Sequence, residues 1–453
     1  MKALSATPAP AEPRFSNRAL AQLIGPLVLE QLLVVTVGMA DTVMVSVNGE
    51  WAVSGISLVD QINTLIIQVF AALATGGAVV ASQYLGRRDR ESACTSARQL
   101  MYALLLLSVA IAVPVLIFNG HILTFVFGKA EPAVMEAAET YFWLSALSYP
   151  FIGIYNAGAA LFRSMGNSKV SLFASAVMNV INIGGNAILI FGLDMGVAGA
   201  AIASLASRAA AAVMVIRLLL DPHKPVNLAD VWRVRVDGGI LRSILSVGIP
   251  SGMENGTFQI GKLLVAGLVT SFGTTAITAN AICNNVGAFS NLPGSAMSLA
   301  MITVIGQCIG AGDYDQAKYY VRKLMLVTVI GMAALNVGIF FAAPPLVGMY
   351  QASDATYDLA LFVLRYNCVC TLWWPPSFAL PNALRAAGDA EFTMGVSMVS
   401  RWVCRVALSY VLGLWFHLGF FGVWMAMTID WAVRAVLFVV RYRSGKWQNA
   451  RVI

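Results

Sequence analysis

The chain has 453 residues, of which 58% are hydrophobic and only 11% are charged. A soluble domain of average composition carries about 25% charged residues, so this chain has too little charge for a water-facing surface of its size. Composition therefore excludes a soluble enzyme, a disordered chain and a nucleic-acid-binding protein. The net charge of +7 is better explained by membrane orientation.

Apolar stretches long enough to cross a bilayer fill most of the chain. A spanning helix needs about 20 mostly apolar residues. Twelve such stretches are predicted, near residues 20–47, 52–82, 96–118, 138–161, 169–191, 196–217, 243–270, 275–305, 321–342, 357–381, 392–415 and 419–440. We therefore predict an all-α membrane protein with twelve transmembrane helices.

The basic residues of the connecting loops fall on one side of these spans. The loops that follow the odd-numbered helices contain a single basic residue, Lys129. The other loops and both ends carry the remaining loop cations, so the positive-inside rule places both termini in the cytoplasm. We expect a multi-pass protein of a bacterial inner membrane, and five tryptophans near span ends are predicted to be interface anchors: Trp143, Trp373, Trp374, Trp415 and Trp424.

The two halves of the chain repeat each other. Pro26 is followed by Glu30 as Pro250 is followed by Glu254, and the two prolines stand 224 residues apart. Six spans per half make the repeats parallel, which is typical of two six-helix lobes around a central cleft in alternating-access transporters. The predicted organisation is an N-terminal tail at 1–19, an N-lobe at 20–217, a linker at 218–242, a C-lobe at 243–440 and a basic tail at 441–453.

Charges at membrane depth are costly and point to function. Glu30 and Asp41 share a face of the first helix, about 16 Å apart at 1.5 Å per residue. Asn182 and Asn186, four residues apart, share a face of the fifth helix. Asp41 with these amides would form an oxygen-rich site for a proton or Na⁺, and Glu30 is grouped with this coupling site.

The second half has different charges. The residue that corresponds to Asp41 is Val265, and cations outnumber acids. We predict that Glu254 contributes to the substrate cleft, although an anion-receiving role for this basic lobe is also open. Four further charges are predicted to form structural ion pairs: Arg401, Arg405, Asp430 and Arg434. The remaining residues predicted to line the cleft are Met39, Asp60, Gln61, Gln68, Asn179 and Asn284.

No nucleotide-binding or catalytic motif accompanies these charges. The glycine-rich segments lack the Lys-Ser/Thr of a phosphate loop, and no convincing intramembrane catalytic constellation is found, so we predict a transporter and not an enzyme. Transport is then driven by an ion gradient or runs downhill, with H⁺ or Na⁺ as the coupling ion and no other cofactor. A single chain of twelve spans is a sufficient monomer, with the bilayer and the substrate as its partners.

An ordered set of motifs carries a family resemblance. In the first half these are Gly25-Pro26, Met39-Ala40-Asp41-Thr42, Ala81–Gly86, Leu161–Asn167, Asn182 with Asn186, and Phe191–Ala200. In the second half they are Ile305–Gly312 and Ala383–Asp389. With these motifs the chain resembles the multidrug and toxic compound extrusion (MATE) transporters over nearly its whole length.

The resemblance implies a function. It implies antiport of H⁺ or Na⁺ against cationic or amphipathic compounds by alternating access, with Asp41, Asn182 and Asn186 at the first-lobe cation site. Two alternatives remain at this point. One is a lipid-linked oligosaccharide flippase of the same superfamily, and the other is a major-facilitator carrier.

Overall fold

The computed structural model describes residues 13–453 except 48, 129 and 232–233, and it does not describe the side chains of residues 39–43 and 46. Within these residues the regular structure is entirely helical. Every predicted span corresponds to one helix or to a consecutive run of helical segments. Eight helices are long and apolar enough to cross a membrane.

The first half consists of six spans. Their helices are α1 (Asn17–Ser46), α2 (Glu50–Arg87), α3 (Arg90–Phe127), α4 (Pro132–Ser164), α5 (Ser168–Asn186) with the π-helical η1 (Ala187–Gly192), and α6 (Gly196–Leu219).

The second half also consists of six spans, three of them interrupted. The first three are α7 (Gly238–Thr270), α8 (Thr274–Ser290) with α9 (Leu292–Gly310), and α10 (Tyr314–Gly348). The fourth is α11 (Asp354–Cys370), η2 (Thr371–Trp373), η3 (Pro375–Ala379) and α12 (Leu380–Ala386). The fifth is α13 (Ala390–Ser400), η4 (Arg401–Ala407), α14 (Leu408–Tyr410) and η5 (Val411–Trp415). The last is α15 (Gly419–Arg443), which the short η6 (Lys446–Asn449) follows.

Proline explains two of the interruptions. Pro293 stands at the start of α9, directly after the break at Asn291. Pro375 and Pro376 lie at the start of η3. Proline lacks a backbone N–H, so these positions lose the hydrogen bonds that would continue a regular helix.

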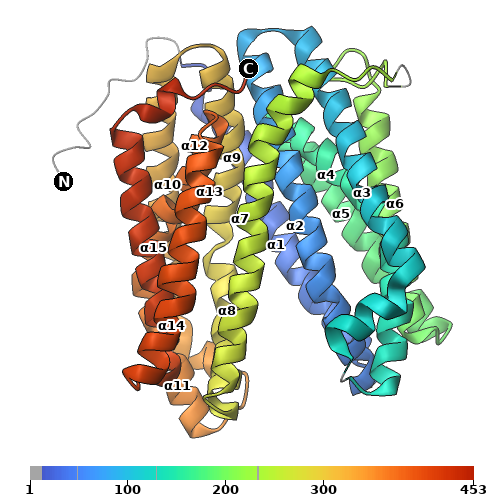
Figure 1. Cartoon of the computed structure of the whole chain (residues 1–453), viewed down its shortest axis with the longest axis vertical. Helices are drawn as coiled ribbons and strands as arrows, with labels where there is room; N and C mark the ends of the chain where they lie inside the picture. Colours follow the sequence, from blue (N-terminus) through green and yellow to red (C-terminus); the bar gives the residue numbers. More distant parts are fainter. Residues whose placement is uncertain (1–12, 48, 129, 232–233) are drawn as a thin grey trace. The chain divides into compact units, whose positions relative to one another are not determined.

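The chain divides into two compact units, and the division runs through two helices. The N-terminal unit comprises residues 25–252 with Ile453, and the C-terminal unit comprises residues 253–452 with the described residues before Gly25. The boundaries therefore cut α1 beside Pro26 and α7 beside Pro250. Figure 1 shows the long helices of each unit running roughly along a common direction.

The beginnings of α1 and α7 are held in equivalent ways. In the C-terminal unit, the Phe15 backbone N–H donates to the Tyr320 hydroxyl of α10 at 2.9 Å. In the N-terminal unit, Gln99 of α3 donates to the Arg235 carbonyl at 2.6 Å. Each half thus anchors the segment that leads into the other half's first helix.

Small residues allow close helix packing in the N-terminal unit. A Cβ on Gly76 of α2 would lie 2.4 Å from the Ile244 carbonyl oxygen of α7, and one on Gly158 of α4 would lie 1.7 Å from a Val215 methyl of α6. Interfaces of this kind are the main source of helix association in lipid, where the hydrophobic effect does not drive helices together.

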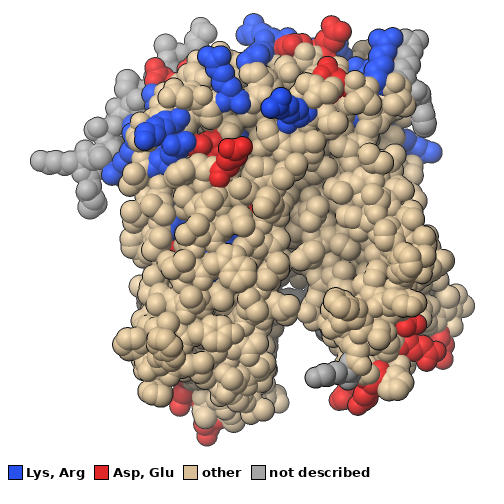
Figure 2. Space-filling model, in the orientation of Figure 1, with Lys and Arg blue, Asp and Glu red and all other residues tan. Residues whose placement is uncertain are grey.

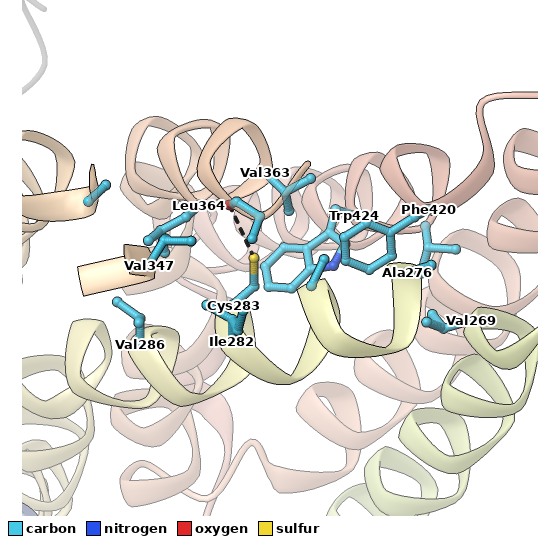
Figure 3. Packing of buried hydrophobic residues seen from close by; sticks show 14 of the residues in the cluster. Val269, Ala276, Ile282, Cys283, Val286, Val347, Val363, Leu364, Phe420 and Trp424 are labelled. Atoms are coloured by element: carbon cyan, nitrogen blue, oxygen red, sulfur yellow. Dashed lines mark hydrogen bonds between the residues drawn. The ribbon is translucent and has the colours of Figure 1, made fainter. Parts of the chain in front are cut away.

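A buried apolar cluster forms one core of the C-terminal unit. It joins α7, α8, α10, α11 and α15 and includes Cys283, Val363, Phe420 and Trp424. Figure 3 shows these side chains facing one another, with the Cys283 thiol 3.5 Å from the Ala360 carbonyl oxygen. The prediction that Trp374 and Trp424 anchor the protein at the membrane interface is wrong, because both are buried.

Charged side chains gather at the ends of the helices. Figure 2 shows that in each unit Lys and Arg crowd at one end, while the opposite end carries mainly Asp and Glu. This is the separation that the positive-inside rule requires of a multi-pass membrane protein.

Candidate functional site

A row of buried amides lies along α5. Asn179, Asn182 and Asn186 are 9%, 6% and 2% exposed. The Asn182 amide donates to the Ser204 hydroxyl of α6 at 3.1 Å, whereas the Asn179 amide nitrogen finds no hydrogen-bond partner in the described part of the chain. Buried amides that are not fully used within the protein are suited to hold a ligand.

Asp41 and Met39 lie in α1, but their side chains are outside the described residues. Their assignment to the cation site and the cleft therefore stays a prediction.

Glu30, eleven residues before Asp41 in α1, is buried and forms an ion pair. It is 5% exposed and lies 3.5 Å from the Arg163 guanidinium of α4. It also accepts a 2.7 Å hydrogen bond from the Ser171 hydroxyl of α5. These contacts join α1, α4 and α5, which is the geometry of a structural clamp; coupling by Glu30 remains a prediction.

A stripe of polar residues along α2, predicted to line the cleft, is partly exposed and partly buried. Asp60 and Gln61 are exposed, and Gln68 is half-buried. Asn63, which the sequence pattern places in the same polar stripe, is buried and accepts a 2.8 Å hydrogen bond from the Tyr149 hydroxyl of α4.

Glu254 in the C-terminal unit repeats the arrangement of Glu30. It forms ion pairs with Arg385 of α12 and with Arg401 of η4. Arg163 and Arg385 occupy matching positions of the two halves, 222 residues apart. The same contact therefore occurs in both halves, Glu30 with Arg163 and Glu254 with Arg385, and Glu254 has Arg401 as a second partner.

Asp430 and Arg434 form an ion pair within α15. Both are fully buried, with 3.2 Å between the closest oxygen and nitrogen. The Asp430 carboxylate accepts a 2.6 Å hydrogen bond from Ser400, and the Arg434 guanidinium lies 4.2 Å over the Phe378 ring.

Arg405 does not belong with these pairs. In the described part of the chain it forms no ion pair, which departs from the prediction. It lies instead 5.2 Å over the Phe258 ring and lines a cavity with Lys262, Asn280 and Asn284. Asn284, which the sequence predicts to line the cleft, lines this cavity.

Among the described residues, no group of three or more His, Cys, Asp and Glu could hold a transition metal. The available donors near α5 are amide and hydroxyl oxygens, which suit a hard cation such as Na⁺ better than zinc or iron.

Comparison with known proteins gives the family. The MatE family model matches residues 26–188 and again residues 250–411. The chain belongs to the MatE family. The two matches begin at Pro26 and Pro250, so the family model recognises the same internal repeat as the prolines and glutamates do.

Relatives and solved structures agree with the MatE assignment over almost the full length. An uncharacterized transporter, YisQ of Bacillus subtilis, is 28% identical over 97% of this chain and 96% of its own. A probable multidrug resistance protein, NorM of Thermotoga maritima, is 23% identical over 96% of this chain and 94% of its own. A solved multidrug resistance MATE family transporter in an outward-facing conformation has a TM-score of 0.87 at 21% identity, covering 95% of this chain and 96% of its own.

These findings confirm the all-α fold and the resemblance to MATE transporters. The major-facilitator alternative is wrong, because the family model places the chain in the MatE family.

Proposed function

We propose that this MatE protein is an antiporter that exports cationic or amphipathic compounds in exchange for H⁺ or Na⁺. Family membership supports membrane transport, and the relatives named as probable multidrug resistance proteins support export of foreign compounds. Transport by alternating access follows from two six-helix repeats that open to either side in turn.

The alignment of α1 with α5 supports the assignment of the cation site. Glu30 of α1 and Ser171 of α5 are in contact. Asp41 lies eleven residues beyond Glu30, and Asn182 lies eleven residues beyond Ser171. Both helices are odd-numbered spans and run in the same direction, so an advance of about 16 Å along each brings Asp41 and Asn182 to the same level.

A carboxylate beside amide oxygens can be neutralised in two ways. A proton can bind to it directly, or Na⁺ can bind between the carboxylate and the amide oxygens of Asn182 and Asn186. Either event removes a negative charge from an apolar environment, where that charge is most costly. The ion can drive transport only if it binds one conformation more tightly than the other.

Efflux of ethidium from intact cells tests this function. Wild-type protein should lower ethidium accumulation, and collapse of the proton gradient or removal of Na⁺ should abolish the effect for the ion that couples. Asp41→Asn keeps the shape of the side chain but not its charge, and should lose at least nine-tenths of the efflux at unchanged expression.

The matched control is Asp354→Asn, which changes an exposed carboxylate at the start of α11 and should leave efflux unchanged. Full efflux by Asp41→Asn would remove the coupling site. Absence of dye efflux together with rescue of a glycan-export mutant would replace the proposal with the flippase alternative.

A further inference from the structure

The C-terminal unit contains more cations at membrane depth than it can pair. Glu254 forms ion pairs with two arginines and Asp430 with one. Lys262 and Arg405 have no such partner in the described part of the chain. Unpaired charges inside a membrane are rare and normally mark a binding site.

Lys262 and Arg405 line one cavity, whereas Arg365 of α11, which also has no ion pair among the described residues, does not. The cavity has a volume of about 60 Å³, and Asn280 and Asn284 of α8 contribute to its wall. A cavity needs about 10–15 Å³ measured in this way to hold one water molecule, so this one has room for a group as large as a carboxylate. Lys262 and Arg405 are near enough to repel each other, and an anion between them would remove that repulsion.

One wall of the cavity belongs to the buried core of the unit. Trp424 and Val423 belong both to the cavity and to the buried core of the unit, and Figure 3 shows Trp424 packed among the core side chains. Arg405 lies in the π-helical segment η4, an irregularity frequent at functional sites. Its Nε has no hydrogen-bond partner among the described residues, so donor capacity remains for a ligand.

The internal repeat shows how this cavity relates to the predicted cation site. With the offset of 224 residues, Val265 of the cavity corresponds to Asp41, and Asn284 corresponds to Asp60. Lys262 corresponds to Gly38. The acids at positions 41 and 60 thus have neutral counterparts in the second half, and a cation stands where the first half has Gly38.

We propose that this cavity binds an anionic group, in the first instance a carboxylate, of the exported compound. The cavity contains the positions that match Asp41 and Asp60 of the first half, without their acids and with two added cations. Lys262 supplies a point charge, Arg405 supplies guanidinium donors, and the Asn280 and Asn284 amides complete the hydrogen bonds. Assigning the ligand as cargo rests on the proposed export function; the binding itself does not.

The test is binding of radiolabelled benzoate to the purified full-length protein in nanodiscs of zwitterionic lipid. Wild type should bind saturably, and Lys262→Gln and Arg405→Gln should each raise the dissociation constant about tenfold or more, as expected for loss of one charge-assisted contact. Arg405→Lys should lose less. Excess benzamide, which is neutral, should not compete, whereas competition by phenyl phosphate would identify a site that accepts phosphate as well.

Two further variants separate binding from folding. Arg365→Gln removes a cation that lies 5.3 Å over the Phe340 ring and away from the cavity, and should bind benzoate as wild type does. Asn284→Asp introduces the acid of the first half, which should raise the thermal midpoint by pairing with the cations and abolish benzoate binding. Equal binding by wild type, Asn284→Asp and Arg405→Gln, or no saturable binding by wild type, would overturn the proposal whether or not dye efflux is observed.

Discussion

The glutamate–arginine pairs are the residue-scale feature that the two halves share. Glu30 lies 3.5 Å from Arg163, with side chains 7% and 15% exposed. Removal of one member of a buried pair leaves an uncompensated charge and costs about 3–5 kcal/mol, whereas removal of both costs much less. We therefore expect Glu30→Gln to lower the free energy of unfolding by about 3 kcal/mol, and Glu30→Gln with Arg163→Gln to recover part of that loss.

Unfolding of the purified variants in detergent, followed as a double-mutant cycle, measures this recovery. A double variant no more stable than Glu30→Gln would contradict the clamp. Normal stability of Glu30→Gln with loss of the pH dependence of efflux would instead assign coupling to Glu30.

Much of the candidate site at residue scale was accessible from sequence. The repeat aligns Glu30 with Glu254 and Arg163 with Arg385. The contact between each glutamate and its arginine depends on how separate helices pack together, and local sequence patterns do not report that packing. The sequence groups Arg405 with the ion pairs because its spacing from Arg401 would place both on one face of an α-helix. The π-helical turns of η4 change that spacing. Both guanidiniums lie over the Phe258 ring, but of the two only Arg401 forms an ion pair with Glu254 among the described residues.

The first turns of α3 and α10 show the repeat at the scale of elements. Asp89 accepts a 3.0 Å hydrogen bond from the Ser92 backbone N–H, and Asp313 accepts a 2.9 Å bond from that of Gln316. Both are N-caps at equivalent positions. Replacement of an N-cap aspartate by alanine costs about 1 kcal/mol, so Asp89→Ala should lower the thermal midpoint, whereas Glu91→Ala in the same turn should change it little.

The cap also predicts a pH dependence. The hydrogen bonds of Ser92, from its hydroxyl first and its backbone N–H second, lower the pKa of Asp89 below its ordinary value. A carboxylate with a lowered folded-state pKa stabilises the fold above its unfolded pKa, and loses that contribution as pH falls through the folded value. The gap between wild type and Asp89→Ala in thermal unfolding should be full at neutral pH and close only below about pH 4; a gap that persists at lower pH would exclude the ionised cap.

The sequence predicts the positions of the helices better than it predicts their breaks and π-helical segments. Hydropathy identifies a span because each must hold about 20 apolar residues across the bilayer, and every predicted span corresponds to a helix or a run of helices. The break at Asn291 had a local cause in Pro293, which could have been used. The π-helical segment η4 contains no proline or glycine, so it depends on packing against neighbouring helices that single-sequence patterns do not report.

At the scale of the whole molecule, the two halves combine one fold with opposite charge. The first half has acids at positions 41 and 60, and the second has Val265 and Asn284 there, with Lys262 and Arg405 added. If both proposals hold, a small cation and the anionic group of an amphipathic compound bind in different halves. The apolar part of the compound then makes no charged contact, so compounds with different apolar parts can bind.

Orientation in the membrane is the remaining whole-molecule property, and the loops determine it. The basic residues lie in loops of one side, and the opposite loops hold only Lys129. Each unit shows the same separation in space (Figure 2). Alkaline phosphatase, which is active only outside the cytoplasm, should therefore be active when fused after Asp194 or Asp354, and inactive when fused after Asp221 or Asp313.

The fusions also test the number of spans, since Asp194 and Asp221 flank one predicted helix, as do Asp313 and Asp354. Green fluorescent protein, which folds in the cytoplasm, should give the inverse pattern at the same four positions and serves as the control for expression. Phosphatase activity at both positions of either pair would mean that the intervening helix does not cross the membrane. For the pair Asp194 and Asp221 this would leave the first half with an odd number of spans, and the parallel repeat would lose its basis, because the two halves would begin on opposite sides.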